Sequence, residues 1–427
     1  MTEKIIYYPQ FNHHLQGVIH LPASKSICNR VLLIQALCGD FTNISNVSES
    51  SDTQILLKSL WLIDDHADLQ TIDVEDAGSA FRFLTAFLAC QESGQYLLKG
   101  TERMHKRPIS GLVEALRTIG ADIQYAEREH YPPLLIKGRT LKGGTINIEG
   151  HISSQFISAI CLIAPMLTKG LVINITHDIV SAPYIHMTLR LMEMFGVHAT
   201  FERKQIIIPI QTYFPITFFV ENDWSSLGFF YAMAMLSNTV AFVVTGLQED
   251  SVQGDAYIKT WAVDMGIESY FEYSQLHIKK KEDAVIKPAQ TYDFSAYPDL
   301  AIPLIVACAI KYPDVRFTGL QHLQYKESDR IASLSSELKK VDIDLHFDKG
   351  LLSIDNSAYK ASGDTIYFNT FHDHRIAMAL SMLALEGFKV VLDDASCVKK
   401  SYPNYFEQLQ ALGFQCNGSN EAIKDKQ

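Results

Sequence analysis

The sequence lacks the marks of disulfide-rich and membrane-spanning proteins. Its seven cysteines are an odd number and no two form a CxxC pair, so we expect reduced, mostly buried thiols and no metal site. No apolar run reaches the roughly 18 residues that span a bilayer. The first residues also lack the long apolar core of a signal peptide. These absences predict a cytoplasmic protein that does not enter a membrane.

Positive charge is also scarce. Lysine and arginine number 37 against 48 aspartate and glutamate residues, which gives a formal net charge of −11. A general nucleic-acid binder carries the opposite sign, so we expect no nucleic-acid partner. Any anion must therefore be bound by local clusters of cations. The length of 427 residues exceeds one ordinary core, and two domains are expected.

One sequence pattern returns six times along the chain. A polar loop leads into a helix rich in alanine and leucine, and a β-rich strand follows after a short break. The intervals between copies are 53, 74, 72, 74 and 75 residues, so the first interval is short. This period predicts a repeated supersecondary unit that reads roughly βαβαββ, although chance similarity between the helices of an ordinary α/β protein is the alternative. The copies begin at Ser26, Ser79, Ser153, Ser225, Asp299 and His374.

The repeated helices are apolar nearly all round, as in LIVACAI at residues 304–310. Such helices are buried on most sides. We therefore predict an α/β protein with two domains, each an inside-out α/β barrel in which sheets coat three buried helices. Residues 23–221 are expected to form the first domain. Residues 1–22 and 222–427 are expected to form the second, which the N-terminal strand would complete.

Cations and hydroxyls gather where these helices begin. A helix N-terminus offers free N–H groups and the positive end of a dipole, so it favours anions. LPASKSICNR carries Lys25, Ser26 and Arg30, and DAGSAF holds Gly78 where a small ligand can approach the backbone. Each feature taken singly is as well explained by a solvated charge or a helix cap. The other clusters are RMHKRP, HISSQF, SAPY, KESDR, HDHR and CVKKSYP.

In their order and spacing these motifs resemble the 5-enolpyruvylshikimate-3-phosphate synthase family, the 3-phosphoshikimate 1-carboxyvinyltransferases. LPASKSICNR resembles the family's LPGSKSxSNR, and DAGSAFRFLTA resembles NAGTAMRPLTA. RMHKRPI, SSQF, PYI, PDLA, KESDRI, DHRIAM and KSYPNYFEQL follow in the family's order over nearly the whole chain. The sequence departs from the family pattern at Ala23, Asp76, Ser79, Phe83 and His322.

The resemblance implies a reaction without a cofactor. The enolpyruvyl group of phosphoenolpyruvate would pass to the 5-hydroxyl of shikimate 3-phosphate by addition and elimination, with release of phosphate. This is a step of the shikimate pathway to chorismate and the aromatic amino acids, and we expect a monomer. One alternative is the enolpyruvyl transferase of peptidoglycan synthesis, but RMHKRP lacks the cysteine which that enzyme uses. The other is a non-catalytic ligand-binding homologue, against which the intact residues argue, namely Asp299, Lys25, Glu327 and Lys400.

The resemblance also implies roles for individual residues. Asp299 would accept the proton of the 5-hydroxyl, and Glu327 or a lysine such as Lys25 would protonate the methylene carbon. The two substrates bring together about five or six negative charges, so their site needs many cations. Shikimate 3-phosphate would be bound by Lys25, Ser26, Arg30, Ser153, Ser154, Gln155, Ser181, Asp299, His322 and Lys326. Phosphoenolpyruvate would be bound by Lys25, Gly78, Arg107, Gln155, Arg330, Arg375 and Lys400.

Overall fold

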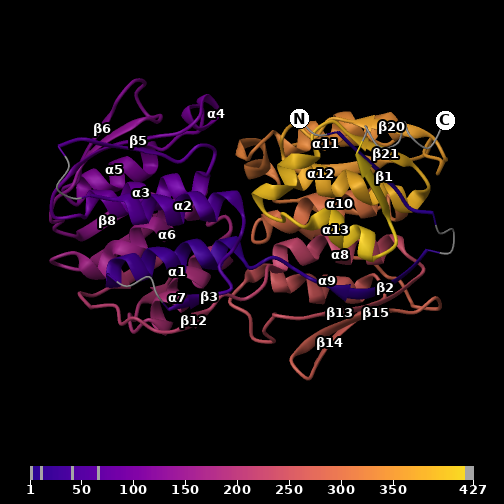
Figure 1. The fold of residues 1–427 in the computed structure, drawn as a ribbon, viewed down its shortest axis with the longest axis horizontal. Helices are drawn as coiled ribbons and strands as arrows, with labels where there is room; N and C mark the ends of the chain where they lie inside the picture. Colours follow the sequence, from indigo (N-terminus) through magenta and orange to yellow (C-terminus); the bar gives the residue numbers. More distant parts are fainter. Residues whose placement is uncertain (1–2, 10–12, 40–42, 65–67, 419–427) are drawn as a thin grey trace. The chain divides into compact units, whose positions relative to one another are not determined.

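The computed structural model describes residues 3–9, 13–39, 43–64 and 68–418. Its contacts divide the chain into two compact units (Figure 1). The continuous unit consists of Ala23–Val220, and the split unit consists of Met1–Pro22 with Glu221–Gln427. Among the helices in these described ranges, none is both long and apolar enough to cross a bilayer.

The second and third repeats of the continuous unit have their strands and long helices in the same order, and the second has one additional short α-helix. In each, the first two strands are parallel and an antiparallel hairpin completes a four-stranded sheet, in the orders β4-β5-β7-β6 and β8-β9-β11-β10. The second repeat contains β4 (Gln70–Asp73), α3 (Gly78–Ala89), β5 (Gln95–Lys99), α4 (Glu102–His105), α5 (Ser110–Thr118), β6 (Asp122–Tyr125) and β7 (Leu134–Lys137). The third contains β8 (Gly144–Glu149), α6 (Ser154–Ile163), β9 (Leu171–Thr176), α7 (Ala182–Met194), β10 (Thr200–Glu202) and β11 (Gln205–Ile208).

The first repeat differs from the predicted βαβαββ pattern because it has no closing hairpin among the described residues. It contains α1 (Lys25–Cys38), β3 (Ile44–Ser45) and α2 (Ser51–Leu62). Its other strand, β12 (Phe218–Phe219), comes from the far end of the unit and pairs in parallel with β3. The short first interval in the sequence repeat reflects this missing hairpin, since α2 is followed almost at once by β4.

The split unit uses two strands from the N-terminal segment. β2 (His14–Ile19) pairs in parallel with β13, and β1 (Lys4–Tyr7) lies between β21 and β22, antiparallel to both. The fourth repeat contains α8 (Trp224–Leu236), β13 (Thr239–Val244), α9 (Ile258–Asp264), β14 (Ile267–Glu272) and β15 (Gln275–Lys280). The fifth contains β16 (Thr291–Asp293), α10 (Ala301–Lys311), β17 (Arg316–Thr318), α11 (Arg330–Leu338), β18 (Asp344–Asp348) and β19 (Leu351–Asp355). The sixth contains β20 (Thr365–Phe368), α12 (His374–Ser381), β21 (Lys389–Leu392), α13 (Tyr405–Ala411) and β22 (Gln415–Gly418).

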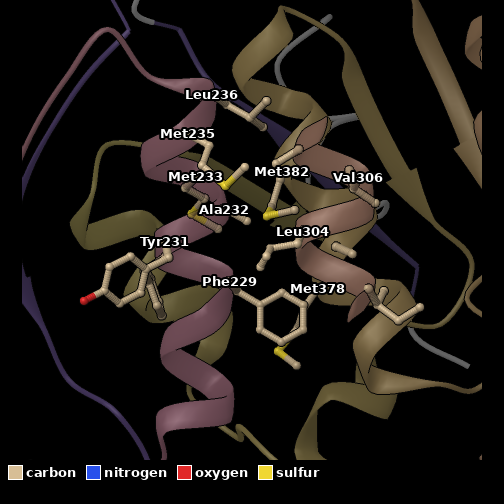
Figure 2. Packing of buried hydrophobic residues seen from close by; sticks show 14 of the residues in the cluster. Phe229, Tyr231, Ala232, Met233, Met235, Leu236, Leu304, Val306, Met378 and Met382 are labelled. Carbon is tan, nitrogen blue, oxygen red and sulfur yellow. The ribbon is translucent and has the colours of Figure 1, made fainter. Parts of the chain in front are cut away.

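The first helix of each repeat lies in the core. Every residue of α8 and of α12 is buried, and so is all of α10 except Lys311. α10 packs against both of the others, with Phe229, Leu304 and Met378 among the side chains that meet there (Figure 2). In the continuous unit α3 and α6 are buried in the same way, and α1 contacts both. The predicted arrangement of buried helices inside sheets is confirmed.

Glu221 marks where the split unit resumes. The sequence placed this residue at the end of the first domain, but its buried carboxylate is bound by the split unit. Oε1 accepts hydrogen bonds from Trp224 Nε1 at 2.8 Å and Gln248 N at 2.9 Å, and Oε2 accepts one from Ser251 Oγ at 2.7 Å. Three donors from one unit fix this side chain there, so the boundary falls one residue earlier than expected.

Candidate functional site

In the continuous unit, the start of α1 presents the first cation. Lys25 and Ser26 lie in its first turn, and the Ser24 side chain caps the helix by accepting from Ile27 N at 3.4 Å. Lys25 Nζ lies 3.1 Å from Oδ2 of Asp52, whose buried side chain belongs to the first turn of α2. The sequence had not picked out Asp52 as the carboxylate that holds this lysine.

Gly78 opens α3 beside two guanidinium groups. A Cβ built on Gly78 would lie 2.5 Å from Arg107 Nη1 and 2.8 Å from Arg82 Nη1. Arg82 Nη1 donates to the Gly78 carbonyl oxygen at 2.7 Å. The missing side chain therefore lets both arginines approach the backbone at the helix start. Gly78 does not lie in the left-handed region, so close approach rather than backbone conformation explains the glycine.

The hydroxyl groups of the third repeat lie at the starts of α6 and α7. Ser153 caps α6 by accepting from Gln155 N at 3.2 Å, and Gln155 Nε2 donates to Ser79 Oγ at 3.1 Å, which links α6 to α3. Ser154 is buried in the first turn. Ser181 precedes α7 with φ 59° and ψ 37°, a left-handed conformation that is uncommon for residues other than glycine.

The split unit gathers the other predicted residues around Arg330, which is 1 % exposed. Arg330 Nε lies 2.9 Å from Asp373 Oδ2, Nη2 lies 2.7 Å from Glu327 Oε2, and Nη1 lies 3.5 Å from Asp299 Oδ1. Burial opposes the charge, but the three carboxylates outweigh it and raise the pKa of Arg330 above its ordinary value. One buried arginine therefore links Asp299 and Glu327.

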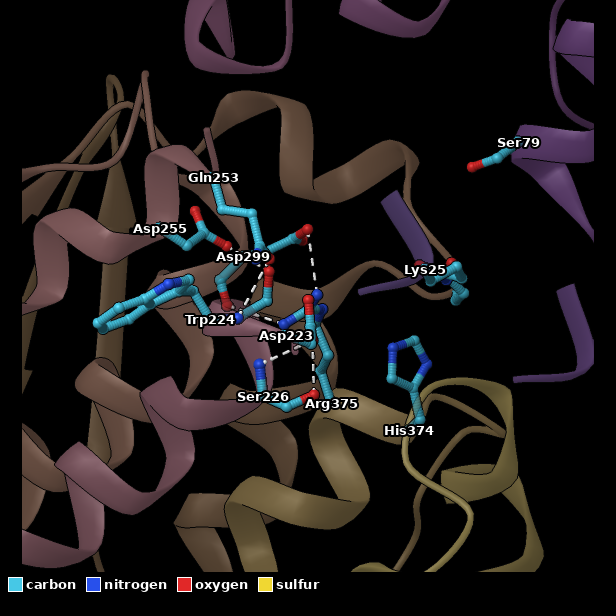
Figure 3. A network of polar contacts seen from close by, with 12 residues as sticks. Lys25, Ser79, Asp223, Trp224, Ser226, Gln253, Asp255, Asp299, His374 and Arg375 are labelled. Atoms are coloured by element: carbon cyan, nitrogen blue, oxygen red, sulfur yellow. Dashed lines mark hydrogen bonds and ion pairs between the residues drawn. The ribbon is translucent and has the colours of Figure 1, made fainter. Parts of the chain in front are cut away.

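Two further cations complete this set. Arg375, at the start of α12, places Nη2 3.1 Å from Asp299 Oδ2 and donates from Nη1 to the Asp299 carbonyl oxygen at 3.0 Å (Figure 3). Lys400 Nζ lies 3.8 Å from Glu327 Oε1. Both predicted catalytic carboxylates of this unit are thus in contact with cations that the sequence had assigned to phosphoenolpyruvate.

Lys326 and His322 lie near the same group. Burial lowers the pKa of Lys326, although Asp299 favours its charge. Burial, followed by the charge of Lys326, lowers the pKa of His322 to about 3, so the imidazole is neutral at physiological pH. The Nε2 atom of His322 is buried, and none of the described residues forms a hydrogen bond with it.

Two buried carboxyls that sequence reasoning missed lie beside Asp299 and Arg375 (Figure 3). Asp223 Oδ2 caps α8, accepting from Ser226 N at 2.9 Å and from Ser226 Oγ at 2.6 Å. Asp255 Oδ2 accepts from Ser225 Oγ at 2.5 Å, whereas Oδ1 is buried without a hydrogen bond to the described residues. Burial raises the pKa of Asp255 to about 7, and Asp299 acts in the same direction.

The Asp255 carboxyl predicts a pH-dependent stability. The folded protein keeps a proton on Asp255 up to a higher pH than the unfolded chain does. The contribution of Asp255 to the free energy of unfolding therefore falls as pH rises from about 4 to about 7. Asp255→Asn cannot ionise, and we expect it to exceed the wild type in unfolding free energy at pH 8 by on the order of 2–4 kcal/mol. Urea midpoints at pH 4.5 and pH 8 measure this, with exposed Asp250→Asn as the control. Parallel pH dependences of Asp255→Asn and wild type would contradict it.

All seven cysteines are free, and Cys28, Cys161, Cys308 and Cys416 are buried. Among the described residues, no three His, Cys, Asp or Glu side chains are grouped as metal ligands.

The buried helices coated by sheets place this chain in the class of inside-out α/β proteins. The solved structure of an EPSP synthase from Acinetobacter baumannii has this fold, with a TM-score of 0.73 at 20 % identity, covering 97 % of this chain and 100 % of that one. The sequence profile of the EPSP synthase (3-phosphoshikimate 1-carboxyvinyltransferase) family matches residues 9–409, and the chain belongs to this family.

Full-length relatives agree with this assignment. A 3-phosphoshikimate 1-carboxyvinyltransferase of Bacteroides fragilis (strain YCH46) is 40 % identical over 403 residues, covering 94 % of this chain and 96 % of the relative. One of Aliivibrio fischeri (strain MJ11) is 35 % identical over 422 residues, covering 93 % and 97 %. The family resemblance found in the sequence is confirmed. The chain is a transferase of the shikimate pathway, which supplies aromatic amino acids.

Proposed function

We propose that this chain transfers the enolpyruvyl group of phosphoenolpyruvate to the 5-hydroxyl of shikimate 3-phosphate and releases phosphate. The observation that carries the proposed mechanism is the ion-paired group in the split unit, where Arg330 contacts both Asp299 and Glu327. Purified protein should release phosphate only when both substrates are present, in a one-to-one ratio with the enolpyruvyl product. Turnover with the peptidoglycan-type acceptor instead of shikimate 3-phosphate would favour the sister enzyme. Binding of both ligands without turnover would indicate a non-catalytic homologue.

The proposed reaction needs a base and an acid. Asp299 accepts the proton of the 5-hydroxyl while the hydroxyl oxygen forms a bond to the central carbon of phosphoenolpyruvate. Glu327 or Lys25 protonates the methylene carbon. In elimination the bond to phosphate breaks and the added proton leaves the methyl carbon, so the acid and base exchange roles. Ion pairs with Arg330 and Arg375 support this assignment, because cations nearby favour the ionised carboxylate that a base requires.

The binding roles are proposed separately for each unit. In the continuous unit, hydroxyls and cations at four helix starts support contacts with anions, and in the split unit the cations around Asp299 do so. For shikimate 3-phosphate the proposed residues are Lys25, Ser26, Arg30, Ser153, Ser154, Gln155 and Ser181 with Asp299, His322 and Lys326. For phosphoenolpyruvate they are Lys25, Gly78, Arg107 and Gln155 with Arg330, Arg375 and Lys400.

The proposal extends to organisation and location. The two compact units, with Glu221 in the split one, support the proposal that the chain has two domains. We propose that the chain acts as a monomer in the cytoplasm. Size-exclusion chromatography with light scattering tests the monomer, which a stable dimer at assay concentration would contradict.

Gly78→Ala is expected to weaken phosphoenolpyruvate binding by displacing Arg107. The new methyl group would lie 2.5 Å from Arg107 Nη1, so the guanidinium must move. We expect the KM for phosphoenolpyruvate to rise about tenfold, equivalent to about 1.4 kcal/mol, while binding of shikimate 3-phosphate changes less than twofold. Steady-state kinetics and calorimetry measure the two effects.

The control for this variant is Gly111→Ala in α5. Among the described residues, a Cβ at Gly111 would meet Phe156 alone, at 3.5 Å, which is an ordinary contact. We therefore expect Gly111→Ala to leave both ligands unaffected. If Gly78→Ala weakened both ligands equally, the displacement of Arg107 would not be the cause.

A further inference from the structure

Arg30 is a buried cation surrounded by neutral groups of its own unit. It is 3 % exposed, and burial lowers its pKa to about 10. Nε donates to Thr188 Oγ1 at 2.7 Å, and Nη1 donates to the Ser26 carbonyl oxygen at 2.7 Å. Nη2 donates to Ser158 Oγ at 3.3 Å and to the Tyr184 carbonyl oxygen at 3.4 Å. In the described part of the chain, no carboxylate forms an ion pair with Arg30, so its charge is available to an external anion.

Two aromatic rings flank the same guanidinium. Its central carbon lies 5.5 Å from the ring centroid of Phe83 and 5.9 Å from that of Tyr184. Both distances allow attraction between the cation and a ring face. Phe83 stands where the family motif has proline, so this ring contact accompanies one of the sequence departures noted above. The rings and the hydrogen bonds together leave the guanidinium little freedom to rotate.

Thr188 accepts the hydrogen bond of Arg30 Nε and also contacts two of the other acceptors. Its side chain is fully buried on α7, and its Oγ1 lies 2.8 Å from both Ser158 Oγ and the Tyr184 carbonyl oxygen. A hydroxyl has one proton to donate and lone pairs to accept with, so Thr188 can donate to one of these oxygens while accepting from Arg30 Nε. Since Nε is the only donor on the stem side of the guanidinium, the bond to Thr188 restrains the plane of the group from that side, and the bonds from Nη1 and Nη2 restrain it from the other.

The donor count of Arg30 shows what this orientation leaves for a ligand. A guanidinium has five N–H donors. The four hydrogen bonds above use one on Nε, one on Nη1 and two on Nη2. One N–H of Nη1 therefore has no hydrogen-bond partner among the described residues, and its direction depends on the plane that Thr188 helps to set.

We propose that Thr188 is a positioning residue, which holds the Arg30 guanidinium in the orientation that binds shikimate 3-phosphate. The inference rests on the proposed function, because it takes shikimate 3-phosphate as the ligand of Arg30. Thr188 itself need not touch the substrate. Its hydroxyl acts through Arg30 Nε, and removal of that oxygen leaves a buried N–H donor unsatisfied.

Thr188→Val tests this with little change of shape. Valine removes the oxygen, so we expect the Kd for shikimate 3-phosphate, measured by calorimetry, to rise about tenfold. The KM for phosphoenolpyruvate at saturating shikimate 3-phosphate should stay within twofold. Thr188→Ser keeps the oxygen and should restore binding to within threefold of the wild type. An unchanged Kd for Thr188→Val, or an equal loss for valine and serine, would overturn the inference.

A double-mutant cycle with Arg30→Lys shows whether Thr188 acts through Arg30. Lysine keeps the charge but lacks Nε, so Thr188→Val should cause no further loss in the Arg30→Lys background. A further tenfold loss there would overturn the inference. So would a urea midpoint of Thr188→Val so low that unfolding of the variant explained its lost binding. Wild-type protein that neither binds shikimate 3-phosphate nor releases phosphate would instead refute the proposed function, and the inference with it.

Discussion

Asp299→Asn is expected to lower turnover about 100- to 10,000-fold while shikimate 3-phosphate still binds. Asparagine keeps the size of the side chain but cannot accept the proton of the 5-hydroxyl. The Arg375 contact to the Asp299 carbonyl oxygen, at 3.0 Å, does not depend on the side chain, so the surrounding backbone should stay in place. The loss should therefore appear in kcat.

Phosphate release and calorimetric titration of shikimate 3-phosphate measure the two quantities on the same preparation. Asp293→Asn is the matched control, because Asp293 lies at the end of β16 and its carboxylate serves Ser295 N at 3.0 Å and Ser295 Oγ at 2.7 Å. Asparagine can accept these bonds. If Asp299→Asn kept more than about a tenth of wild-type turnover, Asp299 would not be the general base.

Asp373→Ala is expected to destabilise the split unit by about 3–5 kcal/mol. The Asp373 side chain is fully buried, and it lies 2.9 Å from Arg330 Nε. It also accepts from Ser328 Oγ at 3.1 Å and, as the cap of α12, from Arg375 N at 2.9 Å. Alanine removes one partner of a buried charge pair and leaves the Arg330 cation less compensated.

Urea unfolding followed by tryptophan fluorescence measures this in a Trp61→Phe background. The other two tryptophans, Trp224 and Trp261, both belong to the split unit, so the signal then reports that unit alone. Asp373→Asn separates loss of the charge pair from loss of the helix cap, because asparagine can still cap α12. A lost cap costs only about 1 kcal/mol. If both variants lost less than about 1 kcal/mol, the Asp373–Arg330 pair would not hold this unit together.

The sixfold repeat was predictable because its helices are apolar on nearly all sides. The six predicted starts, from Ser26 to His374, lie within two residues of the observed helices. The pairing of β1 with β21 and β22 was harder to predict, because strand register depends on side chains that are hundreds of residues apart. The short interval of 53 residues between the first two copies indicated that the first repeat lacks some element. Length alone does not show that the lost element is the closing hairpin.

For the site, the sequence indicated residue types but not their neighbours. The KESDR motif predicted Glu327 and Arg330, yet nothing local shows that Arg330 also meets Asp373 and Asp299. Asp255 was missed because QGDAY resembles an ordinary loop, and only the fold buries its carboxylate beside Asp299. Such contacts arise from tertiary packing, which local sequence patterns do not record.

The strands β1 and β2 have a consequence for the order in which the protein is made. Ile6 pairs with Val390, and the 384 residues from position 7 to Val390 take roughly 20–80 s to synthesise at about 5–20 residues per second. Throughout that time the ribosome has already delivered β1 but not the two strands that flank it. The whole continuous unit, ending at Val220, is complete before β13 emerges to meet β2. The continuous unit is therefore free to fold during translation, whereas β2 must wait for β13 of the fourth repeat and β1 must wait for β21 and β22 of the sixth.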